Sequence, residues 1–376
     1  MSLTFASIGS NSVLYYVPLT ITNSQSTASP SPFQQMVTVN SSNYSKYLAS
    51  NLQNINFQDG SGNILNSWLE SGNSNTSTST IYWVKLPNGI PANSSITIYY
   101  CIYATSVNAF NTTNTGVAPN LTSTYGQYDN GSNVFTQYGG ASWSNFTFIL
   151  GSWTTSNGYL QQTSSDLLSS DFSIIGGPAA LIESVSYTNN GNYILGYILG
   201  TAFNYTTQPG ARVGLIAVAT PTSTPDVFGY RFIGENSNNN PGYISFLNDY
   251  LEWVYDGTYQ GTVSTPYTLV IQNNSGTWSG SLYSGYGTES STPLATLPNT
   301  TYTRANNEGE TTGYIGLSAA YYYGGSLYAN PANFMWFYLR QLPPNAVMPS
   351  VTFGAVKALQ TNQTGGVYNY NVVLIS

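Results

Sequence analysis

The chain alternates short apolar runs with turn residues along most of its length. Runs rich in Val, Ile, Thr, Tyr and Phe recur between Gly, Asn, Pro and Ser, whereas stretches with a helical period are nearly absent. Before the middle of the chain this pattern predicts strands at residues 12–23, 33–40, 54–59, 79–86 and 94–104. We therefore expect an all-β protein.

The segment 94–104 alternates in the way of a strand that is covered on both sides. One set of positions consists of Ile96, Ile98, Tyr100 and Ile102, and the other of Thr97, Tyr99, Cys101 and Tyr103. Both sets are largely apolar or aromatic, so neither is expected to face water. Such a strand is typical of a β-sandwich, and Cys101 is expected to be a core residue.

Turn residues predict how this first part is connected. The sequence DGSG at 59–62 predicts a tight hairpin, and LPNGIPANSS at 86–95 predicts a loop stiffened by Pro87 and Pro91. Residues 105–124 are polar and show no core pattern. They are therefore expected to form a linker between two domains.

Many short strands are predicted after this linker, which favours a jelly-roll sandwich. They lie at 146–150, 179–187, 193–199, 212–220, 266–272, 313–318 and 334–340. The whole chain is then two tandem β-sandwiches, at 1–122 and 123–354, followed by a strand or tail at 355–376. The final GGVYNYNVVLIS is an uncharged apolar run that either closes a sheet in its own chain or completes the open edge of a neighbouring subunit.

Composition narrows the possible chemistry. Charged residues make up 6% of the chain and aromatic residues 15%, whereas soluble proteins carry about 25% charged residues. The net charge of -7 provides no basic patch, so no nucleic-acid partner is expected. The absence of His excludes His-dependent catalytic triads and His-ligated metals, and the lone cysteine excludes an intrachain disulfide and a Cys-rich zinc site.

A surface with few ionisable groups changes little in charge between neutral and acidic solution. Protonation of all fourteen carboxylates would move the net charge from -7 to about +7, a small repulsion for a chain of 376 residues. We therefore expect adaptation to an acidic exterior. The alternative is neutral drift of an adhesin-like surface.

Acceptor sequences for N-glycosylation are spread along the chain, which suits a glycosylated exterior protein. They begin at Asn40, Asn43, Asn75, Asn93, Asn111, Asn120, Asn130, Asn145, Asn204, Asn273, Asn299 and Asn362. No apolar run is long enough for a membrane span, and the densest, FMWFYL at 334–339, has the length of a strand. The N-terminus shows no signal peptide, so either a leader has been trimmed or export follows another route, as for a virion protein released in a particle.

Two parts of the sequence resemble known families. Residues 14–104, with LYYVPLTITNSQ, PFQQMVTVN, NINFQDGSGNILNSWLESGN and STIYWVKLPNGIPANSSITIYY, resemble the domain of unknown function 2341. NVFTQYGG, SWTTSNGYL, TTGYIGLSAA and NFMWFYLRQLPPNAVMPSVTFG resemble the concanavalin A-like or laminin G-like domain that often follows it. The first family has no established activity. The resemblance implies a surface or extracellular protein, of a kind frequent in archaea that live in hot acid.

Acidic pairs are the candidates for catalysis. Concanavalin-like glycosidases place Glu, Asp and Glu at alternating positions of one strand, so that two carboxylates meet one sugar bond; that motif is absent. The nearest pairs are Glu308 with Glu310 and Glu252 with Asp256, which we interpret as solvated turn acids. Asp249, Glu252 and Asp256 could bind calcium only if the fold brings them together. We expect no catalytic residue, no metal and no cofactor; a glycoside hydrolase or lyase is the alternative.

Carbohydrate binding is the function that the composition favours. Sugars stack their apolar faces on exposed aromatic rings, and Asn, Ser and Tyr satisfy their hydroxyl groups without charge. The candidate residues lie near turns or strand ends: Tyr321, Tyr322, Tyr323, Trp253, Tyr255 and Trp278. The competing interpretation is that these rings belong to the core or to cross-strand pairs.

These arguments predict a non-enzymatic structural or adhesive protein on an archaeal cell surface or on the particle of an archaeal virus. Its expected partners are carbohydrates or glycosylated surfaces; further copies of itself or structural neighbours are additional candidates. A second alternative is a filament or capsid subunit that assembles by exchange of the C-terminal strand.

Overall fold

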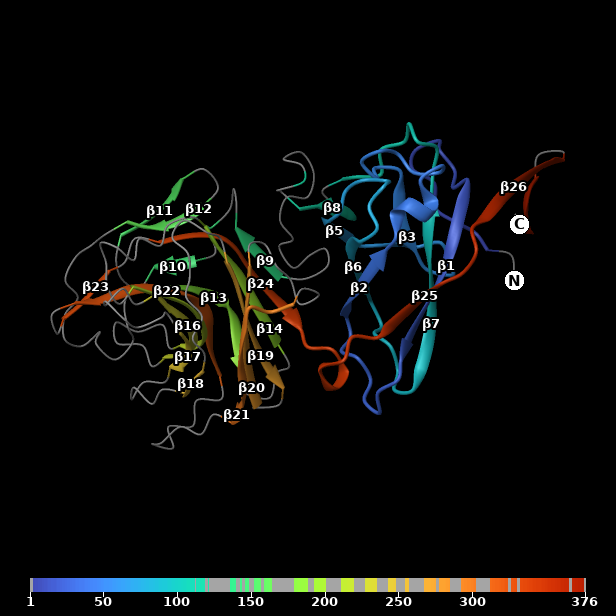
Figure 1. Cartoon of the computed structure of the whole chain (residues 1–376). Coiled ribbons are helices and arrows are strands. Elements are labelled where there is room, and N and C mark those ends of the chain that lie inside the picture. Colours follow the sequence, from blue (N-terminus) through green and yellow to red (C-terminus); the bar gives the residue numbers. More distant parts are fainter. Residues whose placement is uncertain are drawn as a thin grey trace. The chain divides into compact units, whose positions relative to one another are not determined.

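The strands predicted in the first part of the chain are all present in the structure, a computed structural model (Figure 1). They are β1 (Tyr15–Asn23), β2 (Phe33–Val39), β3 (Ile55–Gln58), β6 (Thr80–Leu86) and β7 (Ser94–Ile102). The pattern missed the shorter β4 (Ile64–Leu65), β5 (Ser67–Ser71) and β8 (Thr115–Val117), because two to five residues are too few to show a period.

The structure describes residues 3–118 except 112, and residues 332–374 except 365 and 366. Between these ranges it describes the strands given below and a few residues beside them. Within this described part there is no α-helix, only the 3-10 turns η1 (Ser41–Tyr44) and η3 (Pro344–Ala346). The prediction of an all-β protein is confirmed.

The chain divides into two units. Unit 1 consists of residues 1–136 together with 343–376, and unit 2 of residues 137–342. Unit 1 contains a seven-stranded sheet in the order β27-β26-β1-β7-β3-β4, with β25 also paired to β1, and a four-stranded sheet in the order β2-β6-β5-β8. The strands at its C-terminal end are β25 (Ser350–Phe353), β26 (Lys357–Thr364) and β27 (Val367–Leu374).

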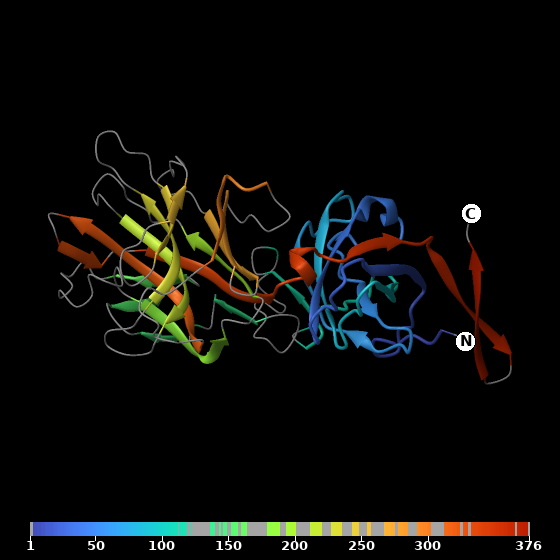
Figure 2. The same ribbon diagram turned by 90° about the horizontal axis from the view of Figure 1, so that it is seen from below.

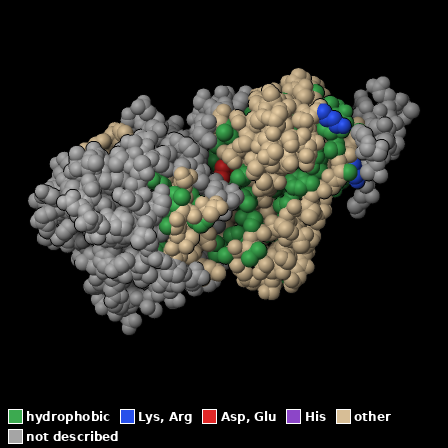
Figure 3. Space-filling view, in the orientation of Figure 1, with side chains coloured by type: hydrophobic (Ala, Val, Ile, Leu, Met, Phe, Trp, Pro, Cys, Tyr) green, Lys and Arg blue, Asp and Glu red, His purple; other side chains and the backbone are tan. Residues whose placement is uncertain are grey.

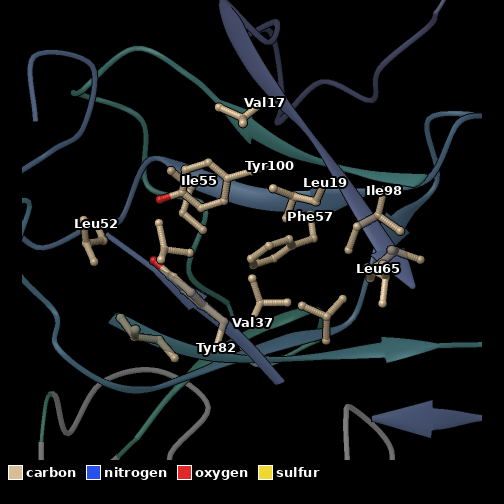
Figure 4. Close-up of a cluster of buried hydrophobic side chains, with 14 of the residues drawn as sticks. Val17, Leu19, Val37, Leu52, Ile55, Phe57, Leu65, Tyr82, Ile98 and Tyr100 are labelled. Atoms are coloured by element: carbon tan, nitrogen blue, oxygen red, sulfur yellow. The ribbon is translucent and has the colours of Figure 1, made fainter. Parts of the chain in front are cut away.

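The core of unit 1 lies between these two sheets. Figure 4 shows Leu19, Phe57 and Ile98 of the seven-stranded sheet facing Val37 and Tyr82 of the four-stranded sheet. All five side chains are buried, with at most 2% of their surface exposed. This arrangement is the sandwich that the alternating pattern predicts.

The second half of strand β7 is covered on both of its faces, as predicted, whereas Thr97 in its first half is exposed. Ile98, Tyr100 and Ile102 belong to the main core cluster. Cys101 and Tyr103 belong to a second buried cluster. Because β7 is central in its sheet, two separate apolar clusters depend on this one strand.

The predicted linker is wrong over most of its length. Residues 105–118 contain β8, which pairs in parallel with β5, and Phe110 and Val117 belong to the main core. Only a few apolar side chains, dispersed among polar ones, anchor this segment. Such sparse anchors leave no periodic signal in the sequence.

The C-terminal segment also belongs to unit 1. The sequence placed residues up to 354 with the second domain, but β25 pairs with β1, with Phe353 opposite Leu19. Strand β26 also pairs with β1, and β27 pairs with β26 to form a hairpin. Of the two alternatives for the last strand, the structure shows pairing within its own chain. Strand pairs so distant in sequence cannot be derived from local pattern.

Unit 2 contains two eight-stranded antiparallel sheets. One has the order β10-β13-β22-β15-β16-β17-β18, with β23 paired to β22, and the other the order β11-β12-β24-β14-β19-β20-β21, with β9 paired to β24. Neighbours far apart in sequence, such as β13 and β22, show that the chain crosses repeatedly between strands, as in a jelly roll. The first sheet contains β10 (Phe146–Phe148), β13 (Ala179–Thr188), β15 (Ala211–Ala219), β16 (Val227–Gly234), β17 (Tyr243–Leu247), β18 (Val254–Asp256), β22 (Thr312–Tyr323) and β23 (Ser326–Ala329). The second contains β9 (Thr136–Gly139), β11 (Trp153–Ser156), β12 (Tyr159–Gln162), β14 (Tyr193–Gly200), β19 (Tyr267–Asn274), β20 (Thr277–Ser284), β21 (Ala295–Thr301) and β24 (Ala332–Gln341).

All seven strands predicted in this part of the chain are present, as β10, β13, β14, β15, β19, β22 and β24. The strand pairing agrees with the predicted two β-sandwiches, but their order is not tandem, because unit 2 lies between the two parts of the chain that form unit 1.

Neutral amide side chains tie several loops of unit 1 to its core. Asn54 is fully buried: its Nδ2 donates to the carbonyl oxygens of Tyr47 (3.0 Å) and Tyr103 (2.7 Å), and its Oδ1 accepts from the Ala49 amide (2.8 Å). Asn23 makes a similar set of bonds, with Nδ2 donating to three backbone carbonyls. Each such amide satisfies several buried backbone groups at once.

We predict that Asn54→Asp lowers the free energy of unfolding by at least about 3 kcal/mol. The substitution replaces the Nδ2 donor with a carboxylate oxygen, which would face the carbonyl oxygens of Tyr47 and Tyr103 in the buried interior. Asn51 lies in the same loop and is exposed, so Asn51→Asp is the matched control and is expected to change stability by less than about 0.5 kcal/mol. Urea unfolding at pH 7 measures both variants. Equal effects would contradict the structural role of Asn54.

Candidate functional site

The three consecutive tyrosines predicted to bind glycans lie at the end of a strand, as expected. Tyr321, Tyr322 and Tyr323 are the last residues of β22, and the register places Tyr321 opposite Tyr328 of β23 and Tyr323 opposite Ser326. The backbone thus places them at a hairpin on one sheet of unit 2.

The other predicted aromatics do not join them. Tyr255 is in β18, and three strands separate β18 from β22 in the same sheet, a distance of roughly 19 Å at the usual strand spacing. Trp278 is in β20 of the other sheet. Trp253 lies outside the described residues. Tyr255 and Trp278 therefore lie on other strands than the three tyrosines.

A different set of aromatic rings forms a continuous stack in unit 2, which we call the aromatic stack. Phe148 is 44% exposed and lies against Trp153, with ring centroids 5.8 Å apart and planes only 15° from parallel. Trp153 in turn contacts Phe334, which is fully buried, at 6.0 Å. The stack therefore runs from an exposed ring into the core.

Edge strands position the two outer rings. Phe148 ends β10, the edge strand of one sheet, and Trp153 begins β11, the edge strand of the other. At an edge strand a side chain lacks a neighbour on one side, so a large ring there stays partly accessible. Only four residues, 149–152, separate the two strands in the sequence.

Uncharged polar residues lie beside the aromatic stack. Ser152, Thr154 and Thr163 are exposed. On the next strands, the Gln161 Nε2 donates to Asn333 Oδ1 at 2.8 Å. The strand predicted at 146–150 contains Phe148, but the sequence does not predict the aromatic stack, because no local pattern shows that Phe148 and Trp153 meet.

The glycosylation candidates of unit 1 fall into two classes. Asn40, Asn43 and Asn93 are exposed. Asn75 and Asn111 use Nδ2, the atom that a glycan would modify, in hydrogen bonds to Leu48 O (3.1 Å) and Ala109 O (3.2 Å) respectively. In Asn273, Asn299 and Asn362 only the backbone is described, and Asn120, Asn130, Asn145 and Asn204 lie outside the described residues.

The acidic candidates for catalysis or calcium binding mostly lie outside the described residues. This holds for Glu308, Glu310, Glu252 and Asp249, whereas Asp256 ends β18. Among the residues that the structure describes, no group of three or more His, Cys, Asp or Glu side chains could hold a metal. In the same part of the chain, no helix has the length and apolarity needed to cross a membrane.

Two ionisable side chains of unit 1, Cys101 and Glu70, are buried. Cys101 is buried, and burial raises the pKa of its thiol well above the ordinary value, so the reactive thiolate is disfavoured. Glu70 is buried at the bulge of β5, where one carboxylate oxygen accepts a hydrogen bond from the Trp83 indole nitrogen.

Asp59 organises the predicted hairpin turn. Partial burial raises the pKa of its carboxyl group, but hydrogen bonds from Asn63 and from the Ser61 backbone lower it more, and the net pKa lies below the ordinary value. The carboxylate accepts from the Ser61 amide and from the Asn63 amide, both at 2.9 Å. The charged form therefore stabilises the turn.

Comparison with known proteins supports the first resemblance. The sequence profile of the family Domain of unknown function (DUF2341) matches residues 51–156. The chain is also 33% identical over 377 residues to Uncharacterized protein 562 of Sulfolobus islandicus rod-shaped virus 1. That alignment covers 89% of this chain, and the chain spans 58% of the length of the curated relative it matches.

Solved structures with similar folds include sugar-binding modules. The carbohydrate binding module CBM66 from Bacillus subtilis is 10% identical with a TM-score of 0.34, over 52% of this chain and 96% of the module. Peanut lectin is 11% identical with a TM-score of 0.39, over 58% of this chain and 98% of the lectin.

The lowered pKa of Asp59 predicts a pH-dependent contribution to stability. A depressed folded pKa stabilises the protein above the unfolded value of about 3.9, and this contribution is lost as the pH falls through the folded pKa. Asp59→Asn is therefore expected to lower the free energy of unfolding at pH 7 and to have little effect at pH 2. Urea unfolding at both values checks this; an equal loss at both would show that the charge is irrelevant.

Proposed function

We propose that this protein is a non-enzymatic adhesive or structural protein that binds carbohydrate through the aromatic stack of unit 2. The observation that carries the proposal is the exposed ring of Phe148, held parallel to Trp153 and anchored through Phe334. An exposed ring held in a fixed position offers a ligand a large apolar contact area at little cost in side-chain entropy.

The chemistry around the stack suits an uncharged sugar. An aromatic face takes the apolar CH face of a pyranose ring, while neighbouring hydroxyl and amide groups exchange hydrogen bonds with its hydroxyls. Ser152 and Thr154 are exposed beside Trp153 and can take part. No ionised group is required, in keeping with a chain that is only 6% charged.

The exterior setting is part of the same proposal. The relative encoded by a rod-shaped virus of Sulfolobus supports a virion exterior over a cellular surface. A surface of neutral amides and hydroxyls would keep its contacts across a wide range of pH. The exposed Asn40, Asn43 and Asn93 are the acceptors that we propose for glycosylation within unit 1.

We predict that Phe148→Ser weakens binding of neutral glycans by about tenfold, the loss expected when one stacking ring is removed. The matched control is Leu294→Ser, which removes an exposed apolar side chain of the same unit (40% exposed) without touching the stack. A glycan array at pH 3 and pH 7, with surface glycans of the host included, identifies the ligand, and calorimetry measures the variants. Release of sugar by the wild-type protein, or equal losses in both variants, would contradict the proposal.

A second candidate function, assembly through strand addition, is favoured by the C-terminal hairpin. Strand β26 pairs with β1 at only two positions, Tyr15 with Ala358 and Tyr16 with Lys357, while β27 pairs with β26 along its whole length. Figure 2 shows this hairpin extending away from the rest of unit 1. In the described part of the chain β27 has no second strand neighbour.

The sequence of β27 lacks the residues that prevent natural edge strands from pairing with other chains. It reads VYNYNVVL, with no charged residue and no proline. A two-stranded hairpin is also only marginally stable in water on its own. An incoming strand from another subunit would satisfy the free backbone groups of β27.

Deletion of residues 366–376 is therefore expected to abolish self-association and to leave unit 1 folded, since none of the described members of its core clusters lies in β27. Light scattering of the full chain and the deletion variant measures the change in mass. A milder variant, Asn371→Lys, places a charge on the edge strand and is expected to weaken association. A full-length protein that is already monomeric at high concentration would exclude strand exchange.

A further inference from the structure

An open groove of about 540 Å³ lies on unit 1, where Tyr15 and Tyr47 pack against the main core cluster. It is lined by Leu14, Tyr15, Lys46, Tyr47, Tyr103, Ala104 and Thr105. Its volume falls within the roughly 300–1,000 Å³ of small-molecule sites. The lining contains three tyrosines, one cation and no acidic side chain.

Two aromatic rings and a lysine form one side of this groove. The rings of Tyr15 and Tyr47 are 4.5 Å apart at 46°. The Lys46 ammonium lies over the Tyr47 ring, 4.8 Å from its centroid. This cation–π contact restrains an exposed lysine that would otherwise sample many rotamers, so the charge is held at the rim before any ligand arrives. Leu14, which is 43% exposed, adds an apolar surface.

The groove is built on rigid parts of the fold. The buried Asn54 donates to the backbone carbonyls of both Tyr47 and Tyr103, which joins two of the lining residues through a single side chain. The Tyr103 hydroxyl accepts from Asn56 (3.0 Å) and Gln58 (2.9 Å) and donates to the Ala6 carbonyl (2.8 Å). Such preorganisation reduces the entropy lost on binding.

The charge distribution favours an anionic ligand at this place. Unit 2 carries eleven acidic and four basic residues, whereas unit 1 carries three of each. Lys46 is thus one of only three cations in unit 1. On the face shown in Figure 3, cationic side chains lie next to hydrophobic ones, and the red acidic patch lies away from them.

We propose that this groove is a second carbohydrate site, specific for a sugar that carries an anionic group such as a carboxylate. The sugar ring lies against Tyr15 and Leu14, its anionic group pairs with Lys46, and the exposed Thr105 hydroxyl bonds a ring hydroxyl. The proposal adds an acidic ligand class and a separate site to the neutral glycan binding assigned to unit 2.

Calorimetry on the full chain tests this site with two probes, a trisaccharide of galacturonic acid and the neutral trisaccharide of galactose. Wild-type protein is expected to bind the acidic probe more tightly. Lys46→Gln is expected to weaken that binding about tenfold, as for loss of a charge-assisted hydrogen bond, and Lys46→Arg to restore most of it. Lys85→Gln removes another lysine of unit 1 as the matched control and is expected to have no effect.

Further variants separate this site from the aromatic stack. Phe148→Ser is expected to leave binding of the acidic probe unchanged, whereas Tyr15→Ala lowers it without altering neutral binding. Loss of acidic-probe binding in Phe148→Ser but not in Lys46→Gln would overturn the groove and keep the stack. Equal binding of both probes, or equally tight binding of polyglutamate, would overturn specificity for an acidic sugar.

Discussion

The fold of unit 1 depends on buried neutral amides that satisfy its loop backbone. Asn23 and Asn54 each bond several main-chain groups that would otherwise be stranded in the apolar interior. In most proteins, buried main-chain groups of this kind are satisfied by a mixture of amides, charged side chains and water. A chain with few charges has to use amides, and because an amide has no charged form, these contacts persist over a wide range of pH.

Uncharged side chains also predominate in the two candidate binding sites. Both the aromatic stack of unit 2 and the groove of unit 1 combine rings with hydroxyl groups, and the groove adds one lysine held against Tyr47. Asn54 connects fold and groove directly, since it bonds the backbone of two residues that line it. Contact surfaces of this kind recognise shape and hydroxyl patterns and provide little machinery for acid–base chemistry.

Much of the architecture could be predicted from sequence, because alternation along a strand is a local signal. The two-sided covering of β7 followed directly from the residues of 94–104. Local pattern failed where structure depends on distant partners: β8 is held by Phe110 and Val117 within a polar stretch, and β25 pairs with β1 across more than three hundred residues. The aromatic stack could not be predicted for the same reason. Phe148 and Trp153 lie in different sheets, and no spacing rule connects them.

The reliance on amide hydrogen bonds also bears on ionic strength. Dissolved ions screen the attraction between exposed charges over roughly 8–10 Å at ordinary concentrations, but they have little effect on a hydrogen bond between a buried carboxamide and a carbonyl oxygen. The hydrogen bonds of Asn54 are therefore equally stable at low and at high salt concentration. A protein stabilised in this way keeps its interior packing when the salt concentration of its surroundings rises or falls.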